Sequence, residues 1–306
     1  MDFIKLFNAM PGAVAQGLVW GIMAIGVYIT YRILDVADLT VDGTIATGGA
    51  VAAMLITSGC NVWIAVLAAF LAGMLAGLVT GVFHTGMGIP AILSGILTQL
   101  ALYSINLRIM NGKANTAVSV NKYSLIITQR NVMRLSRQNP IVLLIAFTAV
   151  VIVLLYLFFG TEYGASLRAT GANGQMARAQ GINTNRAKVV GLMLSNGIVG
   201  LAGALLTQYQ GFVDVNMGRG AIVIGLAAVI IGEVVLGKWF RGFAARLLAV
   251  TVGAIIYYLV MQFVLWLGLN TNDLKMLTAL VVAVFLAFPY WKSTLSTLMP
   301  RNRKEV

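Results

Sequence analysis

The sequence contains few of the residues from which disulfides, metal sites and catalytic centres are built. Its 306 residues include one cysteine, one histidine and nine acidic residues. The single cysteine, Cys60, excludes an internal disulfide and a multi-cysteine metal site, and His84 alone cannot form a histidine cluster. No segment combines a nucleophile with a base. The sequence therefore predicts no metal site, no catalytic residue and no enzyme activity on this chain.

Charged residues are scarce as well, whereas apolar residues are plentiful. They make up 10% and 59% of the chain, and the mean hydropathy is +0.90. Soluble domains carry about 25% charged residues. The net charge of +12 is distributed over the segments between apolar runs, so we attribute it to membrane topology and membrane lipid and expect no nucleic-acid binding. The composition predicts a membrane protein.

Nine apolar runs approach or reach the length of about 20 residues that a membrane-spanning helix needs. The second and seventh are short and interrupted by glycine, as is typical of broken helices that pack inside protein. The sequence therefore predicts one all-α polytopic domain over residues 1–306, with about nine transmembrane helices, two of them broken. The runs are residues 12–31, 43–58, 61–83, 87–107, 140–160, 189–207, 221–237, 243–267 and 274–291.

Counts of Lys and Arg favour a cytoplasmic location for residues 163–183 and for the basic tail at 292–306, with the N-terminus outside. This orientation places twelve of the 21 basic residues inside and nine outside. Six of those nine lie between residues 105 and 139, a segment without an acidic residue. Either this segment is an external amphipathic loop, which we favour, or one span is miscounted.

Two stretches of the sequence resemble each other, VADLTVDGTIATGGAVAAMLI at 36–56 and FVDVNMGRGAIVIGLAAVIIG at 212–232. Each has an acidic residue near its start, a polar turn with glycine and then a short apolar helix. We interpret the halves as inverted repeats over 12–110 and 189–291, whose broken helices line a polar pathway; chance similarity is the alternative. The candidate pathway residues are Asp38, Thr40, Asp42, Asn216, Arg219 and Glu233.

Glu233 has a second interpretation, because it stands close in sequence to Lys238 and Arg241 and could pair with either of them. Other polar residues inside apolar runs have structural interpretations too. We expect Gln99 and Asn196 to hydrogen bond between helices rather than to bind substrate.

Glycine spacing in two of the apolar runs predicts close helix packing. Glycines recur every four residues from Gly73 to Gly81 and every three from Gly197 to Gly203, which allows helix backbones to approach closely. We favour general tight packing, and the sequence leaves open whether either surface contacts another protomer. For His84 we expect packing at the membrane interface, with gating or proton sensing as the alternative.

Residues 163–183, YGASLRATGANGQMARAQGIN, are too polar to cross the membrane. Their composition predicts two short helices, over 166–170 and 175–180, separated by a tight turn and ended by a glycine cap at Gly181. We call residues 161–188 the coupling loop, because a rigid element between two spans is suited to transmit movement from another protein.

The coupling loop resembles that of the permeases of the branched-chain amino acid and simple-sugar ABC importer superfamily. Its pattern Gly-x-x-x-Arg-Ala-x-Gly-x-Asn is followed by Ala-Arg-x-x-Gly-Ile-Asn. ADLTVDG at 37–43 and LAAVIIGE at 226–233 resemble two further elements of that superfamily, and the stretch from Arg32 to Thr44 is most similar to tryptophan and tyrosine permeases. The resemblance assigns ATPase coupling to Gly164, Arg168, Ala169, Gly171, Asn173, Arg178, Gly181, Ile182 and Asn183.

Two departures from the superfamily stand out. Glu233 replaces a glycine that the sugar permeases often have. The substrate preference of the sugar permeases therefore does not carry over to this chain. The first of their ten spans is also missing, which leaves nine.

The resemblance implies a permease subunit of an ATP-driven importer in the bacterial cytoplasmic (inner) membrane. It implies a homodimer of permease copies, cytoplasmic ATP-binding subunits that carry ATP and magnesium, and an external substrate-binding protein. This chain would bind no cofactor. The solute would be an amino acid, with an aromatic or a branched side chain. From the residues alone, the alternative is an ion-gradient-driven secondary transporter with Asp38, Asp42 and Glu233 as coupling carboxylates.

A near match to a phosphate-binding loop occurs from Gly232 to Trp239. Trp239 stands where that motif needs a Ser or Thr to hold magnesium, and an apolar helix precedes it instead of a strand. We therefore expect no nucleotide site on this chain, which is in keeping with an ATPase on a separate chain.

Overall fold

The computed structural model describes residues 3–132, 139–237, 242–268, 273, 276–285 and 287. Most of these residues are helical, and six helices are long and apolar enough to cross a membrane. Three shorter apolar helices accompany them, including the predicted broken helices at Val41–Thr57 and Ala221–Leu236. The predicted all-α polytopic fold is confirmed, whereas the count of nine spans stays a prediction.

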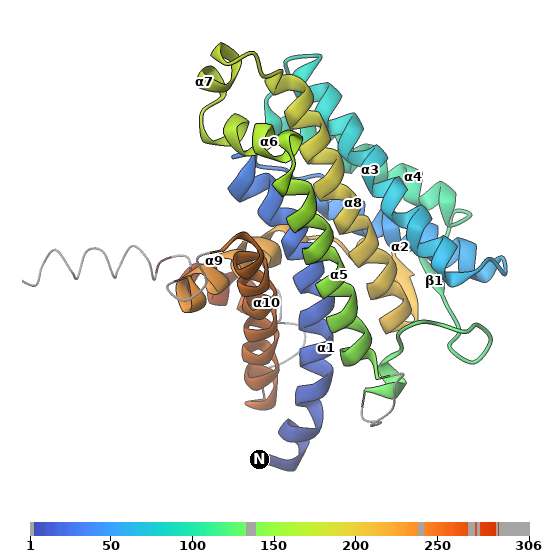
Figure 1. Cartoon of the computed structure of the whole chain (residues 1–306). Helices are drawn as coiled ribbons and strands as arrows, with labels where there is room; N and C mark the ends of the chain where they lie inside the picture. The colour runs from blue at the N-terminus through green and yellow to red at the C-terminus, as the bar shows by residue number, and fades with distance from the viewer. Residues whose placement is uncertain are drawn as a thin grey trace, which may run out of the picture.

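The elements form a bundle in which segments from both halves of the chain intermix (Figure 1). Their order is α1 (Phe3–Tyr28), a π-helical turn (Ile29–Ile33), α2 (Val41–Thr57), α3 (Val62–Thr85), α4 (Ala91–Ile109), β1 (Asn115–Ala117), a 3-10 turn (Gln129–Asn131), α5 (Pro140–Gly160), α6 (Glu162–Ala172), α7 (Gly174–Ala179), α8 (Thr184–Gln210), β2 (Phe212–Asp214), α9 (Ala221–Leu236) and α10 (Phe243–Trp266).

Several predicted boundaries shift in the structure. The first span was predicted over 12–31, but α1 begins at Phe3, includes Pro11 and continues into the π-helical turn. Of the ninth predicted span, only 276–285 and 287 are described, and the tail at 292–306 lies outside the described residues.

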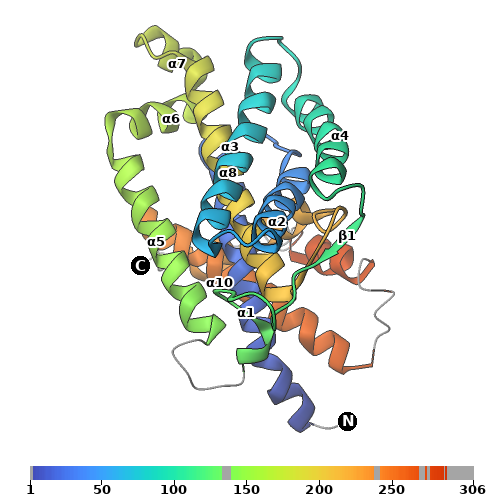
Figure 2. The same cartoon turned by 90° about the vertical axis from the view of Figure 1, so that its right-hand side faces the viewer.

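α1 and α8 form the centre of the bundle. In the most apolar 18-residue stretch of the span that contains α1, 83% of residues are buried, and in that of α8 72% are. The corresponding value is 28% for both α4 and α5. Figure 2 shows α8 surrounded by α2, α3 and α1. α4 and α5 are therefore the helices with the largest surface available to lipid or to another protein.

The two glycine series pack against helices of the same chain. A Cβ on Gly73 would lie 2.2 Å from the Asn196 carbonyl oxygen, and one on Gly77 would lie 2.3 Å from that of Leu192. From the other side, a Cβ on Gly200 would lie 2.5 Å from the Ala69 carbonyl oxygen. α3 and α8 thus approach so closely that neither surface is free for another protomer.

The coupling loop and the segment from 110 to 132 lie at opposite ends of the bundle (Figures 1 and 2). α8 has 27 residues, about 40 Å at 1.5 Å per residue, and runs from α7 to β2. β2 pairs antiparallel with β1, with Thr116 opposite Val213; the sequence did not predict this strand pair. β1 thus lies at the end of the bundle opposite the coupling loop, and the external location of this segment stays a prediction.

Cys60 offers a direct test of orientation. It is exposed in the turn between α2 and α3, and nearby the Tyr123 hydroxyl donates to the Thr57 carbonyl at 3.1 Å. Cys60 therefore lies at the same end as residues 110–132, and we expect a membrane-impermeant maleimide to label it in intact cells. Gln175→Cys in a Cys60→Ser background should react only after permeabilisation. The reverse pattern would show that the coupling loop faces outward.

Candidate functional site

The two short helices begin next to each other, and one side chain joins them. α2 begins at Val41 after an irregular stretch, and α9 begins at Ala221 after a series of turns. The two carboxylate oxygens of Asp42 accept hydrogen bonds from the backbone N–H groups of Gly220 and Ile222, both at 2.9 Å. Asp42 therefore caps the N-terminus of α9 and compensates its partial positive charge.

Asp38 belongs to a buried hydrogen-bond network near the midpoint of α8. One of its oxygens accepts from the Thr40 N–H at 2.9 Å, and the other accepts from the Asn196 side-chain amide at 2.7 Å. The Thr44 hydroxyl donates to the Asn196 side-chain oxygen at 2.7 Å. Asp38 is 2% exposed and Asn196 is 0% exposed. The predicted interhelical role of Asn196 is confirmed, with α2 as its partner helix.

The network extends through threonine hydroxyls into two more helices. Thr40 and Thr80 are 2.7 Å apart at their hydroxyl oxygens, and Thr80 donates to Thr98 at 2.9 Å. All three side chains are buried. The residues around the start of α2 are thus fixed to α3, α4 and α8, and Asp38 and Thr40 have their polar groups engaged there.

A cavity of about 390 Å³ opens beside the joined helix starts. It brings together three of the predicted pathway residues, Asp42, Asn216 and Arg219, but neither Asp38 nor Thr40. The other lining residues are Gly43, Gln99, Leu100, Tyr103, Asn106 and Val215.

Residues of α4 supply the polar wall of this cavity that the sequence analysis missed. Gln99 was expected to bond between helices, but it lines the cavity with Tyr103 and Asn106 instead. The signal was available, because positions 99, 103 and 106 fall on one face of a helix. Asn106 is 1% exposed, and its side-chain oxygen has no hydrogen-bond partner in the described part of the chain.

Local hydrogen bonds hold the coupling loop in shape. The side-chain oxygen of Asn173 accepts from the N–H of Met176 at 3.0 Å and caps α7, and that of Asn183 accepts from Arg186 N–H at 3.1 Å and caps α8. Gly181 has a φ of +82°, which permits the turn between them. The two predicted helices and the glycine cap are confirmed.

Further bonds and contacts fix α6 and α7 to the bundle. Arg178 donates through Nε to the Thr184 hydroxyl at 2.7 Å. A Cβ on Gly171 would lie 1.8 Å from the Ile33 carbonyl oxygen, and one on Gly164 would lie 2.4 Å from that of Phe158. These glycines let the backbone of α6 rest directly on the π-helical turn and on the end of α5.

The remaining loop residues differ in exposure. Ala169 and Ile182 are half-buried, and Arg168 lines a cavity towards α1 and α10. Met176 in α7 is 63% exposed and was not singled out from the sequence. An apolar side chain on a protruding short helix is suited to contact another protein.

The family model for the permease component of branched-chain amino acid transport systems matches residues 10–288. The chain belongs to this family. It is a transport subunit of an ABC-type importer and a multi-pass protein of the inner membrane, and it is not an enzyme.

Curated relatives of this permease cover most of its length. The tyrosine transport system permease protein of Clostridioides difficile is 42% identical over 98% of this chain and 99% of its own. The uncharacterized protein RP368 of Rickettsia prowazekii is 32% identical over 92% and 97%. The ribose import permease protein RbsC of Escherichia coli is 26% identical over 89% and 78%.

In this permease, Glu233 lies apart from the cavity beside α4. It stands near the far end of α9 and pairs with Arg32 of the π-helical turn at 2.9 Å. Both expected partners, Lys238 and Arg241, lie outside the described residues. The structure thus gives Glu233 a partner 201 positions away, which sequence proximity could not indicate.

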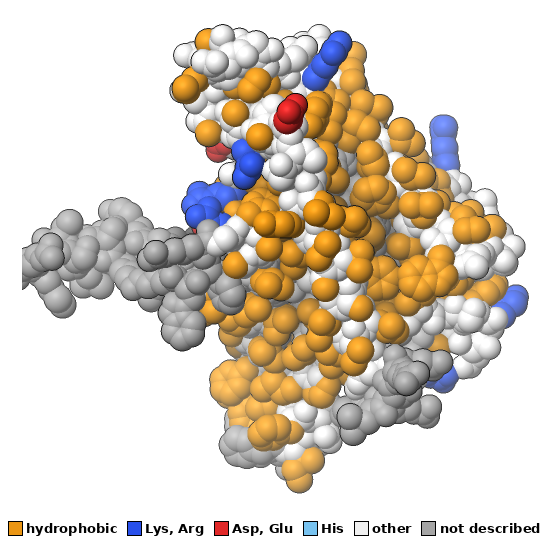
Figure 3. Space-filling model, in the orientation of Figure 1, with side chains coloured by type: hydrophobic (Ala, Val, Ile, Leu, Met, Phe, Trp, Pro, Cys, Tyr) orange, Lys and Arg blue, Asp and Glu red, His pale blue; other side chains and the backbone are white. Residues whose placement is uncertain are grey.

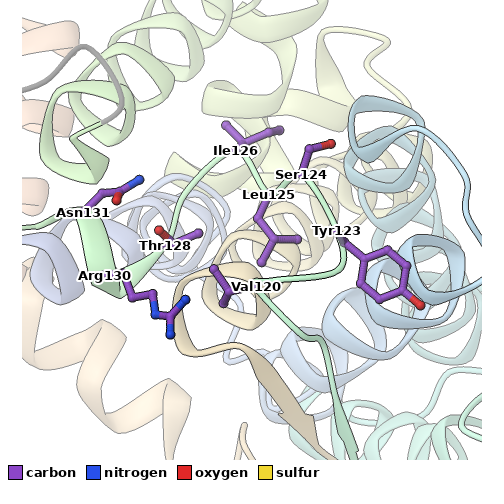
Figure 4. Close-up of a pocket in the computed structure, with 8 residues that line it drawn as sticks. All are labelled: Val120, Tyr123, Ser124, Leu125, Ile126, Thr128, Arg130 and Asn131. Atoms are coloured by element: carbon purple, nitrogen blue, oxygen red, sulfur yellow. The ribbon is translucent and has the colours of Figure 1, made fainter.

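The segment from 110 to 132 covers the ends of α2 and α8 opposite the coupling loop. The Ile126 N–H donates to the Gln208 side-chain oxygen at 3.1 Å. The segment forms a hollow of about 740 Å³, shown in Figure 4 with Arg130 on its rim. The described cations at this end are exposed, namely Arg108, Lys113, Lys122 and Arg130; Arg134 and Arg137 lie outside the described residues.

Within the described ranges, no group of three His, Cys, Asp or Glu residues could hold a metal ion. His84 has its Nδ1 2.9 Å from the Ile89 carbonyl oxygen and its Nε2 3.3 Å from Lys188 Nζ. Because a carbonyl can only accept, Nδ1 carries the proton and Nε2 accepts from the lysine. His84 therefore joins the end of α3 to the start of α8.

Proposed function

We propose that this permease forms the translocation pathway for a zwitterionic amino acid, in an importer powered by a separate ATPase. The observation that carries the proposal is the cavity between α4 and the joined starts of α2 and α9. It contains a cation, Arg219, that forms no salt bridge within the described residues. Beside it lie an unpaired acceptor on Asn106 and the ring of Tyr103.

These groups complement the functional groups of an amino acid. The guanidinium of Arg219 suits the substrate carboxylate, because charge-assisted hydrogen bonds are the strongest kind. The Asn106 oxygen suits an ammonium donor, and the exposed ring of Tyr103 suits an apolar or aromatic side chain. The 42% identical relative named for tyrosine transport supports an aromatic amino acid.

The contacts of the coupling loop suggest how an ATPase would move this cavity. α6 rests on the carbonyl of Ile33, and the eight residues from 34 to 41 lead from there through Asp38 to Asp42, which caps α9. A displacement of α6 would therefore be relayed along one short, hydrogen-bonded path to the cavity wall. We assign ATPase contact to α7, with the exposed Met176 at its centre.

A second permease copy and an external binding protein complete the proposed assembly. The cavity is walled by α4, whose outer surface is largely exposed, so a pathway through one copy would open towards lipid. A second copy facing α4 would close it. At the other end, the exposed cations around Arg130 are suited to an acidic docking surface on a binding protein that delivers substrate.

The secondary-transporter alternative finds less support. Coupling carboxylates must exchange protons or bind ions, but both oxygens of Asp38 and Asp42 accept hydrogen bonds. Glu233 is paired with Arg32. None of the three is left as a free carboxylate beside the cavity.

Proteoliposomes that contain the permease, a co-expressed ATP-binding subunit and the binding protein test the proposal. We expect tyrosine uptake to require ATP and to persist when an ionophore collapses ion gradients. Arg219→Gln should lower uptake by about tenfold, because the substrate carboxylate loses a charge-assisted hydrogen bond. Arg219→Lys, which keeps the positive charge in the cavity, is the matched control and should retain most of the uptake. Uptake driven by an ion gradient without ATP would contradict the proposal.

A further inference from the structure

A different cavity, of about 540 Å³, lies at the coupling-loop end between α1, α6 and α10. Three of its lining residues are arginines from three separate elements: Arg32 in the π-helical turn, Arg168 in α6 and Arg246 in α10. Figure 3 shows Lys and Arg side chains gathered below α6. We call this the arginine cavity.

The arginine cavity has an excess of positive charge. Arg32 is paired with Glu233 at 2.9 Å, yet its side chain remains 55% exposed. Arg168 and Arg246 are exposed and form no salt bridge with any residue that the structure describes. Three guanidinium groups that converge on one hollow repel one another unless an anion lies between them. The cavity is therefore suited to a phosphate group, which has several acceptor oxygens.

An apolar cavity of about 460 Å³ adjoins the arginine cavity and shares Arg168 and Phe243 with it. Its other lining residues come from the end of α5 and the turn after it, among them Leu157 and Gly160. Leu157 is 61% exposed, and the outer face of α5 is apolar along its length (Figure 3). The polar hollow thus continues into a surface that faces hydrocarbon.

We propose that these two cavities bind one anionic phospholipid, with its phosphate among the three arginines and an acyl chain along α5. The surrounding helix ends support this depth: α5 ends at Gly160 and α10 begins at Phe243, as expected where lipid headgroups lie. A soluble anion would use the arginines alone, whereas a lipid also buries its chain against apolar side chains. The lipid would bridge α6, α1 and α10. The proposed membrane orientation of the permease decides only the leaflet in which this lipid lies, not the binding site itself.

The test is lipid retention by the purified full-length permease, measured by native mass spectrometry. We expect the wild-type protein to retain phosphatidylglycerol in preference to phosphatidylcholine. Arg168→Gln and Arg246→Gln should each weaken phosphatidylglycerol binding about fivefold, because each removes one cation near the headgroup. Arg186→Gln, which changes an exposed arginine in the first turn of α8 at the same end, should leave it unchanged.

A steric variant separates a lipid from a free anion. A Cβ on Gly160 would meet nothing within 4 Å, so Gly160→Trp can occupy the apolar cavity while it leaves all three arginines in place. It should weaken phosphatidylglycerol binding. Millimolar inorganic phosphate should not displace phosphatidylglycerol from the wild-type protein. Such displacement, or equal retention of both lipids by the wild type, overturns the proposal. Because the permease is tested alone, this outcome is independent of any result on ATP-driven uptake.

Discussion

Gly171→Ala is expected to lower solute uptake more than tenfold while the ATPase of the proposed complex continues to hydrolyse ATP. The new Cβ would lie 1.8 Å from the Ile33 carbonyl oxygen, far inside van der Waals contact. Because the obstacle is a backbone carbonyl and the new Cβ is fixed to the backbone of α6, no side-chain rotation relieves the clash. α6 must therefore move away from the π-helical turn. The measurement is the ratio of solute transported to ATP hydrolysed in proteoliposomes.

Gly174→Ala is the matched control for this variant. It adds the same methyl group three residues further on, where a Cβ meets nothing within 4 Å, and it should keep the wild-type ratio. A size-exclusion profile and a thermal unfolding curve show whether Gly171→Ala remains folded. A folded Gly171→Ala protein with a wild-type transport ratio would contradict a coupling role for the contact between α6 and Ile33.

Asn196→Leu is expected to destabilise the permease by more than about 3 kcal/mol. The two side chains have similar volumes, but leucine leaves one oxygen of Asp38 without its partner and leaves the Thr44 hydroxyl only the longer bond to the Thr40 carbonyl. A buried polar group that loses its partner costs about 1–3 kcal/mol, and a charged one costs more. Thermal unfolding in detergent measures the loss as a fall in the apparent Tm.

An exchange variant shows whether the hydrogen bonds themselves are responsible. Asp38→Asn combined with Asn196→Asp reverses the two groups, so that an amide can still donate to a carboxylate and Thr44 can still donate to position 196. This pair should recover part of the stability that Asn196→Leu loses, because both variants lack the bond from the side chain at 196 to the Leu192 carbonyl. Asn185→Leu, at an exposed position in the first turn of α8, should change stability little. An exchange variant as unstable as Asn196→Leu would refute the explanation.

The sequence predicted the features that depend on local pattern. Short apolar runs with glycine and an acidic residue at the start identified both short helices, which are continuous in the structure, and Asp42 and Arg219 as polar residues beside them, which line one cavity. The coupling loop was predictable because Asn173 and Gly181 are recognisable cap residues. These features follow from interactions within a few residues of each other.

Features that depend on tertiary contacts were missed or assigned differently. The partner of Glu233 is Arg32, because the end of α1 packs beside α9, and no spacing rule connects residues so far apart. Gln99 was interpreted as an interhelical partner because amides in apolar helices usually are; only the position of α4 beside the start of α9 shows that it lines a cavity. Gly171, which the resemblance assigned to ATPase coupling, packs against the backbone of Ile33.

The head-to-head arrangement of α2 and α9 also has an electrical consequence. Each helix start carries about half a positive charge, and the carboxylate of Asp42 supplies one negative charge between them, so the three contributions nearly cancel. Arg219 then sets the net charge that a solute meets, and a bound amino acid zwitterion adds none. Moving one elementary charge across 100 mV costs about 2.3 kcal/mol, so passage of a solute without net charge is neither assisted nor opposed by the membrane voltage.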